Sequence, residues 1–334
     1  MRRLLAVACA LLIHLAAGTA APAATLKLGT LAPEGSPWYE VIRDMGEAWK
    51  EISDGQINMR IYPGGIAGDE GDMVRKMRIG QLHIAALSGG GLADIAPEIR
   101  ALQMPMMFRS YDELDYVRER IRPELEAAFE ARGFTLLTWG DAGWLYFFTQ
   151  EPVVGPDDLK ALKLFVWTGN TAFVEAWKDL GYQPVPLAAT EIHMGLLSGL
   201  INAVIVPPIA ALSFQWFALA NHMTDLKFVP LVGALIISTG TWESFPEEIK
   251  PLLLDAAHEA GRRLREVRHL GEQAIDVMQD HGLLVHPVPP SLVAAWEERA
   301  RLGYPKIIGT VVPPDLVAKV ERLRDEYRAS GGGR

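Results

Sequence analysis

Histidine is the side chain most often used to bind metal ions in proteins, and its spacing in this sequence does not suit a metal site. His258, His269 and His281 lie 11 and 12 residues apart on an expected helix, which places them loosely on one face. They cannot bind one metal ion together, because zinc ligands on a helix lie about four residues apart. We therefore expect no metal ion and interpret these histidines as solvated or at the edge of the core.

Motifs that would indicate catalysis are also missing from the sequence. It contains no G-x-S-x-G, no H-E-x-x-H and no P-loop. The glycines at 89–91 could cradle an anion, but they lack the flanking Lys-Ser/Thr of a phosphate-binding loop. We expect a tight turn from a strand to a helix there. The acid pairs at 157–158 and 247–248 are typical of helix starts, so we expect no catalytic residue and no cofactor.

The elements that would position a binding site alternate between strands and helices, which is typical of an α/β fold. We predict, in order, strand 26–30, helix 36–52, strand 56–62, helix 69–79 and strand 83–87. Ser36 is expected as the N-cap of the first helix and Pro37 as its first residue. A helix–Gly–strand unit recurs as helix 190–197, Gly199 and strand 202–206, which weakly supports two similar lobes.

A long amphipathic helix is predicted over residues 246–281. Only Pro251 could interrupt it, and that residue lies in the first turn, where proline is tolerated. About 35 residues at ~1.5 Å each give roughly 50 Å, which is longer than one small domain. We therefore expect this helix to contact two lobes and couple them. A second amphipathic helix is expected over residues 314–328.

The N-terminus is typical of an exported protein. Arg2 and Arg3 precede an apolar run over residues 4–17, and a small-residue cleavage pattern follows at 21–23. We predict a cleaved signal peptide over residues 1–23 and a periplasmic location. The run is too short for a membrane anchor, which needs about 20 apolar residues. Cys9 lies in the middle of the run and is interpreted as an ordinary residue of the apolar run rather than as the site of a lipid anchor.

Cleavage would remove the only cysteine, so the mature chain could form neither a disulfide nor a thiolate metal site. The roughly 310 residues that remain are enough for two domains. Cleavage also lowers the number of basic residues from 32 to 30, against 41 acidic ones, which gives a formal charge of −11. Such an acidic surface argues against binding nucleic acid or anionic lipid.

Six segments, taken in order, resemble the substrate-binding subunits of TRAP transporters, in the DctP family. They are 26–29 (LKLG), 62–70 (YPGGIAGDE), 80–84 (GQLHI), 104–106 (MPM), 158–164 (DLKALKL) and 242–246 (WESFP). The resemblance implies a bilobal periplasmic binding protein of the α/β class, with two mixed-sheet lobes, a hinge and a small-molecule ligand in the cleft. It also implies two partners, the small and large membrane subunits of a sodium-gradient-driven permease.

From this resemblance and the expected elements we predict the limits of the two lobes. Lobe I comprises residues 25–142 and 232–275, and lobe II comprises residues 143–231 and 276–334. Closure around the ligand would be a hinge motion, and the ligand would lie between the lobes, where small molecules usually bind.

The resemblance also locates the residues that hold an organic acid in this family. The arginine position that follows the "LKGLK" segment is Phe165 here, a second arginine position is Leu145, and an asparagine position is Val206. Charge-assisted bonds from arginine are the strong interactions of a carboxylate site, and a buried carboxylate without a partner is costly. We therefore expect a small, uncharged ligand that is hydrophobic or aromatic.

Aromatic residues on the same strands supply the other expected contacts, although on sequence alone they fit the lobe cores equally well. Phe165 and Trp167 should share one face of their strand, and Ser88 should lie opposite the anchor positions. The expected ligand-binding residues are Phe165, Leu145, Val206, Trp167, Trp144, Trp139, Phe147, Ser88, Leu87, Leu31, Ala189, Pro207 and Phe214.

Other functions remain open at this point. A receptor could still bind a carboxylate through a relocated basic residue such as Lys163. Neutral sugars stacked on tryptophan would need more Asn, Asp and Gln in the cleft strands than the sequence provides. An exported enzyme on the same fold would need a nucleophile–base pair that the sequence does not show, although a fold does not determine function. A scaffold or docking protein is the last alternative.

The signal-peptide prediction can be tested on secreted material. N-terminal sequencing should begin close to Ala24, and mass spectrometry should find no acyl group on Cys9. Recovery of a full-length or lipidated chain would contradict the predicted cleavage.

Overall fold

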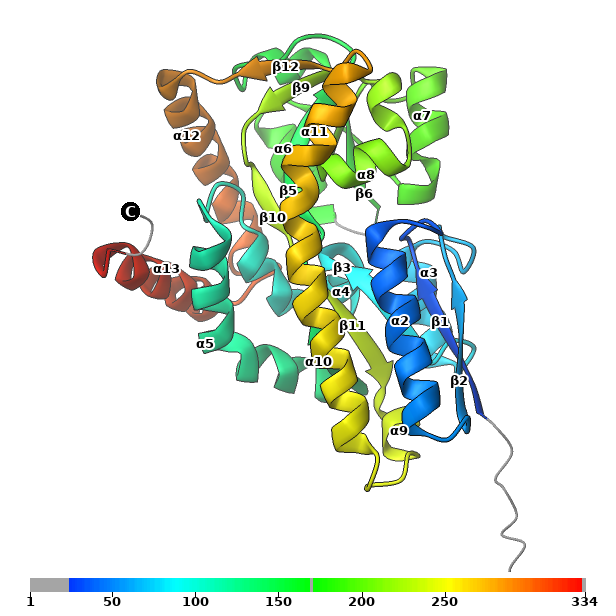
Figure 1. Cartoon of the computed structure of the whole chain (residues 1–334). Coiled ribbons are helices and arrows are strands. Elements are labelled where there is room, and N and C mark those ends of the chain that lie inside the picture. Colours follow the sequence, from blue (N-terminus) through cyan, green and yellow to red (C-terminus); the bar gives the residue numbers. More distant parts are fainter. Residues whose placement is uncertain (1–23, 169–170, 332–334) are drawn as a thin grey trace, which may run out of the picture.

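The computed structural model describes residues 24–168 and 171–331. Figure 1 shows two β-sheets, one above the other, with a long helix running alongside both. The predicted signal peptide, residues 1–23 with Cys9, lies outside the described residues. Within the described residues, no helix has the length and apolar character needed to cross a bilayer.

The first sheet is mixed, with the strand order β2-β1-β3-β11-β4. β1 runs parallel to β2 and β3, whereas β11 runs antiparallel to β3 and β4. Its alternating pattern is clearest in β1, where Leu26 and Leu28 are buried and Lys27 is exposed. The strands are β1 (Ala24–Thr30), β2 (Ile57–Tyr62), β3 (Ile84–Ser88), β4 (Phe134–Trp139) and β11 (Gly233–Ser238).

The second sheet is also mixed, with the order β12-β9-β5-β8-β6-β7 and with β10 paired to β5. All residues of β5 and β8 are buried, because helices or the other lobe cover both faces of these central strands. The strands are β5 (Gly143–Thr149), β6 (Lys163–Trp167), β7 (Gln183–Leu187), β8 (Ala203–Val206), β9 (His222–Asp225), β10 (Val229–Leu231) and β12 (Leu284–Pro287). The predicted α/β class with two mixed sheets is confirmed.

Helices cover both sheets. The first begins as predicted, because the backbone N–H of Tyr39 donates to Ser36 Oγ at 3.3 Å and Pro37 is its first residue. The α-helices are α2 (Pro37–Ile52), α3 (Glu70–Arg78), α4 (Gly89–Ile95), α5 (Tyr111–Glu130), α6 (Thr171–Asp179), α7 (Ile192–Ser198), α8 (Pro208–Ser213), α9 (Thr239–Glu243), α10 (Lys250–Val267), α11 (Gly271–Asp280), α12 (Pro290–Ile307) and α13 (Pro314–Ala329). Short 3₁₀ helices are η1 (Pro97–Gln103), η2 (Asp158–Ala161), η3 (Ala189–Glu191), η4 (Trp216–Ala218) and η5 (Arg268–Leu270).

The long helix predicted over 246–281 begins later, at Lys250, and is interrupted once. α10 and α11 are joined by the single 3₁₀ turn η5. α10 packs against α2 and β4 of the first sheet, and α11 packs against α8 beside the second. Figure 1 shows the two helices in line, in yellow and orange, passing from the lower sheet to the upper one. The helix therefore contacts both lobes, as predicted.

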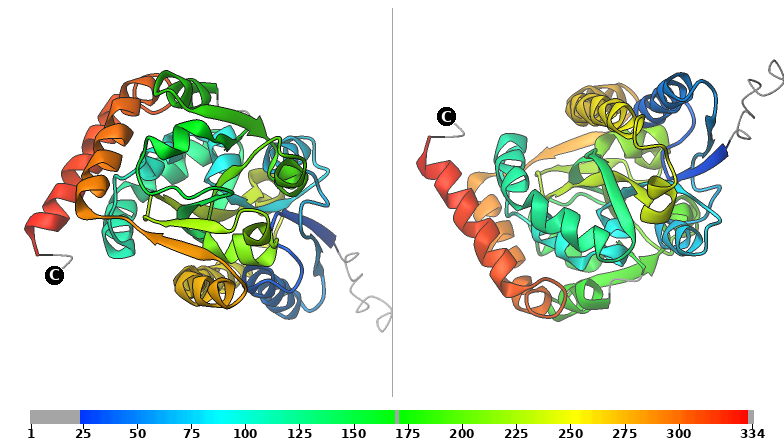
Figure 2. Two further views of the ribbon diagram at one scale, coloured as in Figure 1. Left: turned by 90° about the horizontal axis from the view of Figure 1, so that it is seen from above. Right: turned by 90° about the horizontal axis from the view of Figure 1, so that it is seen from below.

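The C-terminal helices return the chain to the first sheet. α12 packs against α6 of the second lobe, but α13 packs against α5 and η1, which lie in the range predicted for lobe I. Figure 2 shows α12 and α13, in orange and red, together along one side of the molecule. The predicted lobe limits stay a prediction. Every strand falls on the expected side of them, whereas α13 lies against lobe I although it was assigned to lobe II.

A buried group of four charges lies where the chain crosses between the sheets. Asp141, between β4 and β5, is 1% exposed, and Arg118 and Arg268 are 2% and 5% exposed. Asp141 accepts from Arg118 Nη1 at 2.6 Å and from Arg268 Nη1 at 2.8 Å. Asp115 accepts from both arginines as well, at 2.6 Å from Arg268 Nη2. The two cations and two anions balance, and they join α5, the segment between β4 and β5, and the η5 turn.

We predict that Asp141→Asn lowers the free energy of unfolding by about 3–5 kcal/mol, because it leaves two buried arginine charges to share the single carboxylate of Asp115. Urea denaturation followed by circular dichroism would measure the loss. The control is Asp157→Asn, which removes an exposed carboxylate paired with Lys160 and Arg299 and should change stability little. Equal effects of the two substitutions would contradict a structural role for the buried group.

Candidate functional site

An apolar cavity lies between the two sheets, at the carboxyl ends of strands from each. β1 and β3 end there on one side, and β6 and β8 end there on the other. Ligands of α/β proteins commonly bind beyond the carboxyl ends of strands, because loops and helix starts leave a crevice there. The two helix–Gly–strand units noted in the sequence, α3 to β3 and α7 to β8, both lead into this crevice.

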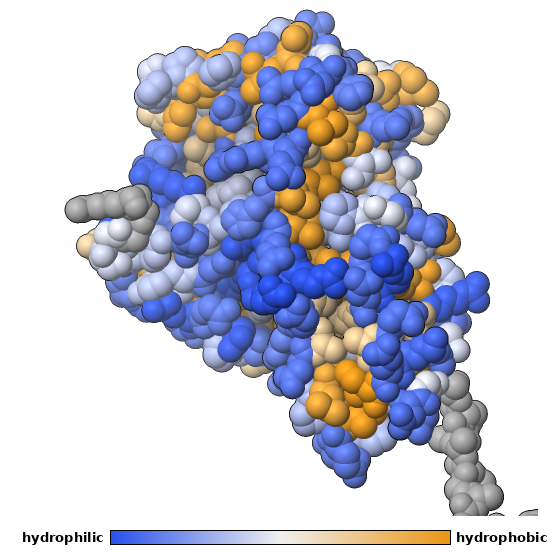
Figure 3. All heavy atoms as spheres, in the orientation of Figure 1, coloured by the Kyte–Doolittle hydropathy of each residue, from blue (hydrophilic) through white to orange (hydrophobic). Residues whose placement is uncertain are grey.

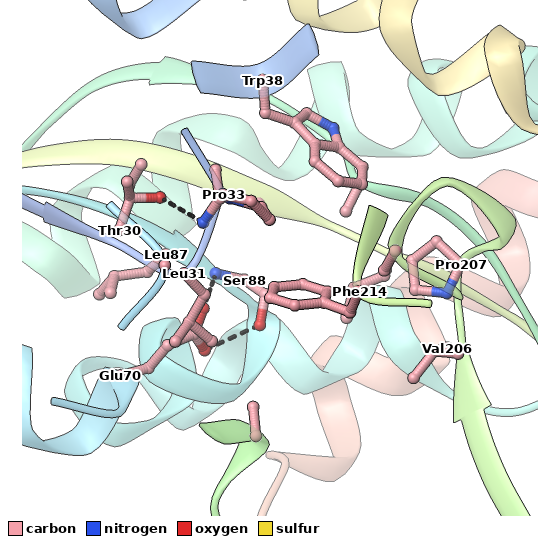
Figure 4. Close-up of a pocket in the computed structure, with 18 of the residues that line it drawn as sticks. Thr30, Leu31, Pro33, Trp38, Glu70, Leu87, Ser88, Val206, Pro207 and Phe214 are labelled. Carbon is pink, nitrogen blue, oxygen red and sulfur yellow. Dashed lines mark hydrogen bonds between the residues drawn. The ribbon is translucent and has the colours of Figure 1, made fainter. Parts of the chain in front are cut away.

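The cavity has a volume of about 360 Å³, within the usual range for a small-molecule site. Figure 4 shows the rings of Trp38 and Phe214 and the side chains of Pro207 and Val206 around it. The described residues that line it include no lysine and no arginine, and Glu70 is the one carboxylate among them. The cavity is therefore mostly apolar, with its polar groups confined to a few positions.

Glu70 is held within the protein rather than presented to the cavity as a free charge. Ser88 donates to it from its backbone N at 2.6 Å and from its Oγ at 2.8 Å, and the N–H of Gly91 donates at 2.8 Å. Burial raises the pKa of Glu70, and these three hydrogen bonds oppose the shift. The carboxylate thus occupies the N–H groups at the start of α4, which could otherwise attract an anion.

The glycines at 89–91 pack closely against the side chains of Glu70 and Gln103. A Cβ on Gly91 would lie 2.7 Å from Glu70 Cβ, and a Cβ on Gly89 would lie 1.8 Å from Gln103 Oε1. Ser88 forms the N-cap, and α4 begins at Gly89 directly after β3. The predicted tight turn from strand to helix is confirmed.

Aromatic rings make up much of the opposite wall of the cavity. Phe214 stacks on Trp216, with ring centroids 4.6 Å apart and planes 10° apart. Trp167, at the end of β6, lines the cavity from the second lobe, and Trp38 lines it from α2 of the first lobe. The Nε1 atoms of Trp38 and Trp167 are buried and have no hydrogen-bond partner among the described residues.

The structure brings eight of the sequence-predicted residues together around this cavity. They come from loops and strand ends of both lobes and are Leu31, Leu87, Ser88, Trp167, Ala189, Val206, Pro207 and Phe214. Trp167 lies beside Phe165 with a centroid distance of 4.9 Å, so the predicted shared strand face is confirmed.

The other five predicted residues lie outside the cavity. Phe165 is fully buried behind Trp167. Leu145 and Phe147 lie on the face of β5 opposite to Trp144, because side chains alternate along a strand. The Phe147 ring stacks on that of Trp296, with centroids 5.1 Å apart. Trp144 packs on Tyr111 at 5.6 Å, beside a different hollow. The last residue, Trp139, is buried with Arg118 Cζ 5.7 Å from its ring.

Comparison with known families decides the assignment. Residues 28–309 match the family model of the bacterial extracellular solute-binding proteins, family 7 (DctP). The chain belongs to this family. The family consists of substrate-binding receptors rather than enzymes, and the chain is accordingly a TRAP-type solute-binding protein.

Curated relatives of this solute-binding protein cover most of its length. It is 24% identical to the 2,3-diketo-L-gulonate-binding periplasmic protein of Escherichia coli, over 79% of this chain and 81% of that protein. It is also 24% identical to the sialic acid-binding periplasmic protein of Vibrio cholerae, over 78% of this chain and 82% of that protein. These relatives are periplasmic.

Solved structures share the fold. A TRAP periplasmic solute-binding protein from Sulfurospirillum deleyianum with bound succinate has a TM-score of 0.84 at 22% identity, covering 91% of this chain and 100% of that one. One from Xanthobacter autotrophicus with bound β-D-galacturonate has a TM-score of 0.83 at 21% identity, covering 90% and 99%. The bilobal fold is thereby shown.

Sequence analysis of this solute-binding protein missed several residues that line the cavity, chiefly Trp38, Glu70 and Trp216. Trp38 could have been found, because it is in the first turn of a helix that directly follows a parallel strand, where α/β sites form. Glu70 was visible only as part of the 62–70 segment. Nothing in the local pattern marks Trp216, since it reaches the cavity through the turn after α8.

Two basic residues matter for carboxylate binding. Lys163, the expected substitute, is exposed at the start of β6, and its Nζ donates to the carbonyl of Gly199 at 3.0 Å, so it is not part of the cavity. Arg100 lines a separate cavity of about 80 Å³ that shares Trp167 with the larger one. Its guanidinium lies 5.1 Å from the Phe173 ring, and burial lowers its pKa to about 10.

We predict that Glu70→Ala lowers the free energy of unfolding by about 2–4 kcal/mol, because it leaves buried N–H donors at Ser88 and Gly91 without an acceptor. Urea denaturation at pH 7 would measure the change. Glu47→Ala is the matched control, since Glu47 is an exposed residue on α2 and its removal should have little effect. A loss no larger than that of the control would contradict the structural role given to the carboxylate.

Proposed function

We propose that this protein is a periplasmic receptor that captures an uncharged, largely apolar small molecule between its lobes. The observation that carries the proposal is the composition of the cavity wall. Hydrocarbon and aromatic side chains from both lobes surround about 360 Å³, and no lysine or arginine is among the described residues that line it. Burying apolar ligand surface there is favourable by roughly 25 cal/mol for each Å².

Electrostatics supports the same conclusion. A carboxylate ligand would lose its hydration on entry and would find no lysine or arginine in the described wall to replace it, which is costly. It would also lie near Glu70, whose oxygens already accept three hydrogen bonds. The N–H groups at the start of α4, which suit an anion in other proteins, are engaged by that side chain. A neutral ligand meets none of these penalties.

A second candidate is a carboxylate receptor that uses Arg100. Arg100 borders the small cavity on the other side of Trp167, and the structural relatives carry succinate and β-D-galacturonate. Rotation of Trp167 would join the two cavities and bring a ligand acid toward the guanidinium. Coulombic interaction with Asp94 and Glu70 already stabilises that charge, however, so a third carboxylate would compete with two internal ones.

The proposed location and partners follow from the family. Its members are periplasmic, which supports a periplasmic location for this chain after removal of residues 1–23. We propose that the closed, loaded receptor docks on the small and large membrane subunits of a TRAP permease. Figure 3 shows mainly hydrophilic surface around the middle of the long helix and a band of apolar surface beside it, so one face offers both kinds of contact.

The ligand class can be tested with benzophenone, a neutral two-ring molecule, against succinate and D-galacturonate. Titration calorimetry should detect benzophenone binding with a negative heat-capacity change, as expected when apolar surface is buried, and with little dependence on salt. The acids should bind at least about 100-fold more weakly, since they lack a charged partner in the cavity. Tight binding of either acid, and none of benzophenone, would contradict the proposal.

The cavity wall can be tested by truncation. Phe214→Ala should weaken benzophenone binding by about tenfold, because it removes a buried ring that lines the cavity. The control is Leu302→Ala, since Leu302 is an exposed apolar residue on α12 at 61% exposure. It should leave binding unchanged. Equal affinities of both variants and the wild type would place the ligand elsewhere.

A further inference from the structure

Two tryptophans in the lobe cores pair their buried indole N–H with a backbone carbonyl. Trp49 Nε1 donates to the carbonyl of Leu253 at 3.0 Å, and Trp296 Nε1 donates to the carbonyl of Val154 at 3.0 Å. Both side chains are almost fully buried. A buried donor without an acceptor is costly, and the sequence supplies a carbonyl in each core.

Two of the three tryptophans that line the cavity are different. Trp38 Nε1 and Trp167 Nε1 are buried, and neither has an acceptor among the described residues. Trp139 Nε1 also lacks one, but it lies outside the cavity, where the guanidinium of Arg118 approaches its ring. The unpaired donors of the cavity come one from each lobe, from α2 and from β6.

Three other polar groups of the cavity, Thr30, Ser88 and Glu70, already have hydrogen-bond partners within the protein. Thr30 Oγ1 accepts from the N–H of Ala32 at 3.1 Å, which leaves its hydroxyl hydrogen to donate. Ser88 Oγ donates to Glu70 at 2.8 Å. Glu70 accepts three hydrogen bonds from the protein. Among the described residues, the two indole N–H groups of Trp38 and Trp167 are therefore the buried, unpaired side-chain polar groups of this cavity wall.

We propose that the native ligand is a neutral molecule with a hydrogen-bond acceptor, of the carbonyl or ether class, on an apolar ring body. This inference rests on the proposed function, because it assumes an uncharged ligand in the same cavity. The acceptor oxygen would receive hydrogen bonds from Trp38 Nε1 and Trp167 Nε1, and the ring body would lie against Phe214 and Trp216. Because one donor belongs to each lobe, the acceptor also favours the closed arrangement of the lobes.

A pair of probes that differ by one group tests the assignment. Benzophenone carries a carbonyl between its rings, and diphenylmethane carries a CH₂ in the same place. Equilibrium dialysis with the mature protein should give about tenfold tighter binding of benzophenone, since the hydrocarbon leaves buried donors unpaired. Trp38→Phe and Trp167→Phe keep a ring and remove the N–H. Each should weaken benzophenone by about threefold to tenfold and leave diphenylmethane nearly unchanged.

Trp216→Phe is the matched control, because Trp216 lines the same cavity and is not among the residues with a buried, unpaired N–H. It should change the affinity for both probes by the same factor. Unfolding midpoints of the three variants verify that each is folded.

The outcomes separate the two proposals. Equal binding of both probes by the wild type, or equal losses for both probes in Trp38→Phe and Trp167→Phe, would overturn the acceptor assignment while leaving the proposed function intact. Binding of neither probe overturns the assignment as well. If succinate or D-galacturonate then binds tightly, the neutral-ligand function falls with it.

Discussion

The structure depends on the buried ion-pair group around Asp141. Arg118 is on α5, and Arg268 is in the turn between α10 and α11. Both donate to Asp141, which lies on the segment that connects the first sheet to the second. Buried charges are tolerated only when each has a partner, so these three elements meet at one point. Tyr111 adds to this arrangement, because its hydroxyl donates to the Arg268 carbonyl at 3.1 Å and its ring lies 4.2 Å from the guanidinium. The sheets on either side form their own cores, and the cleft lies between them.

Strand geometry explains why the cleft could be predicted only in part. The order of strands and helices, the N-cap at Ser36 and the shared face of Phe165 and Trp167 follow from periodicity and local chemistry, and the structure bears them out. Trp144 and Leu145 could not both face one cavity, since neighbours on a strand point to opposite faces. The sequence does not reveal which face borders the cleft, because that depends on how the second sheet packs on the first.

Contacts between segments that are far apart in the sequence could not be predicted from local sequence patterns. Glu70 meets Ser88 and Gly91 across 18 and 21 residues of sequence, and Arg100 reaches Trp167 from a 3₁₀ helix of the other lobe. No periodicity marks such residues. The run of glycines at 89–91 did signal a close approach, but the partner that requires it, a buried carboxylate, became visible only in three dimensions.

The charged groups that maintain this fold have their partners inside the protein, including Glu70, which also lines the cavity. Asp141 and the two arginines pair with one another, and Glu70 pairs with the start of α4, so each charge is satisfied within the protein. The positions that hold acids in the resembled family can therefore become Phe165, Leu145 and Val206 without leaving a charge unpaired. Phe165 and Leu145 are buried in hydrophobic clusters outside this cavity, and Val206 alone of the three lines it. Loss of the acid anchors thus extends the hydrocarbon packing of the lobe up to the cavity wall. Under the proposed function, recognition would depend on the aromatic rings of the cavity wall and on the unpaired N–H groups of Trp38 and Trp167. A fold whose charges are paired internally can accommodate a different ligand class in its cavity without a change of architecture.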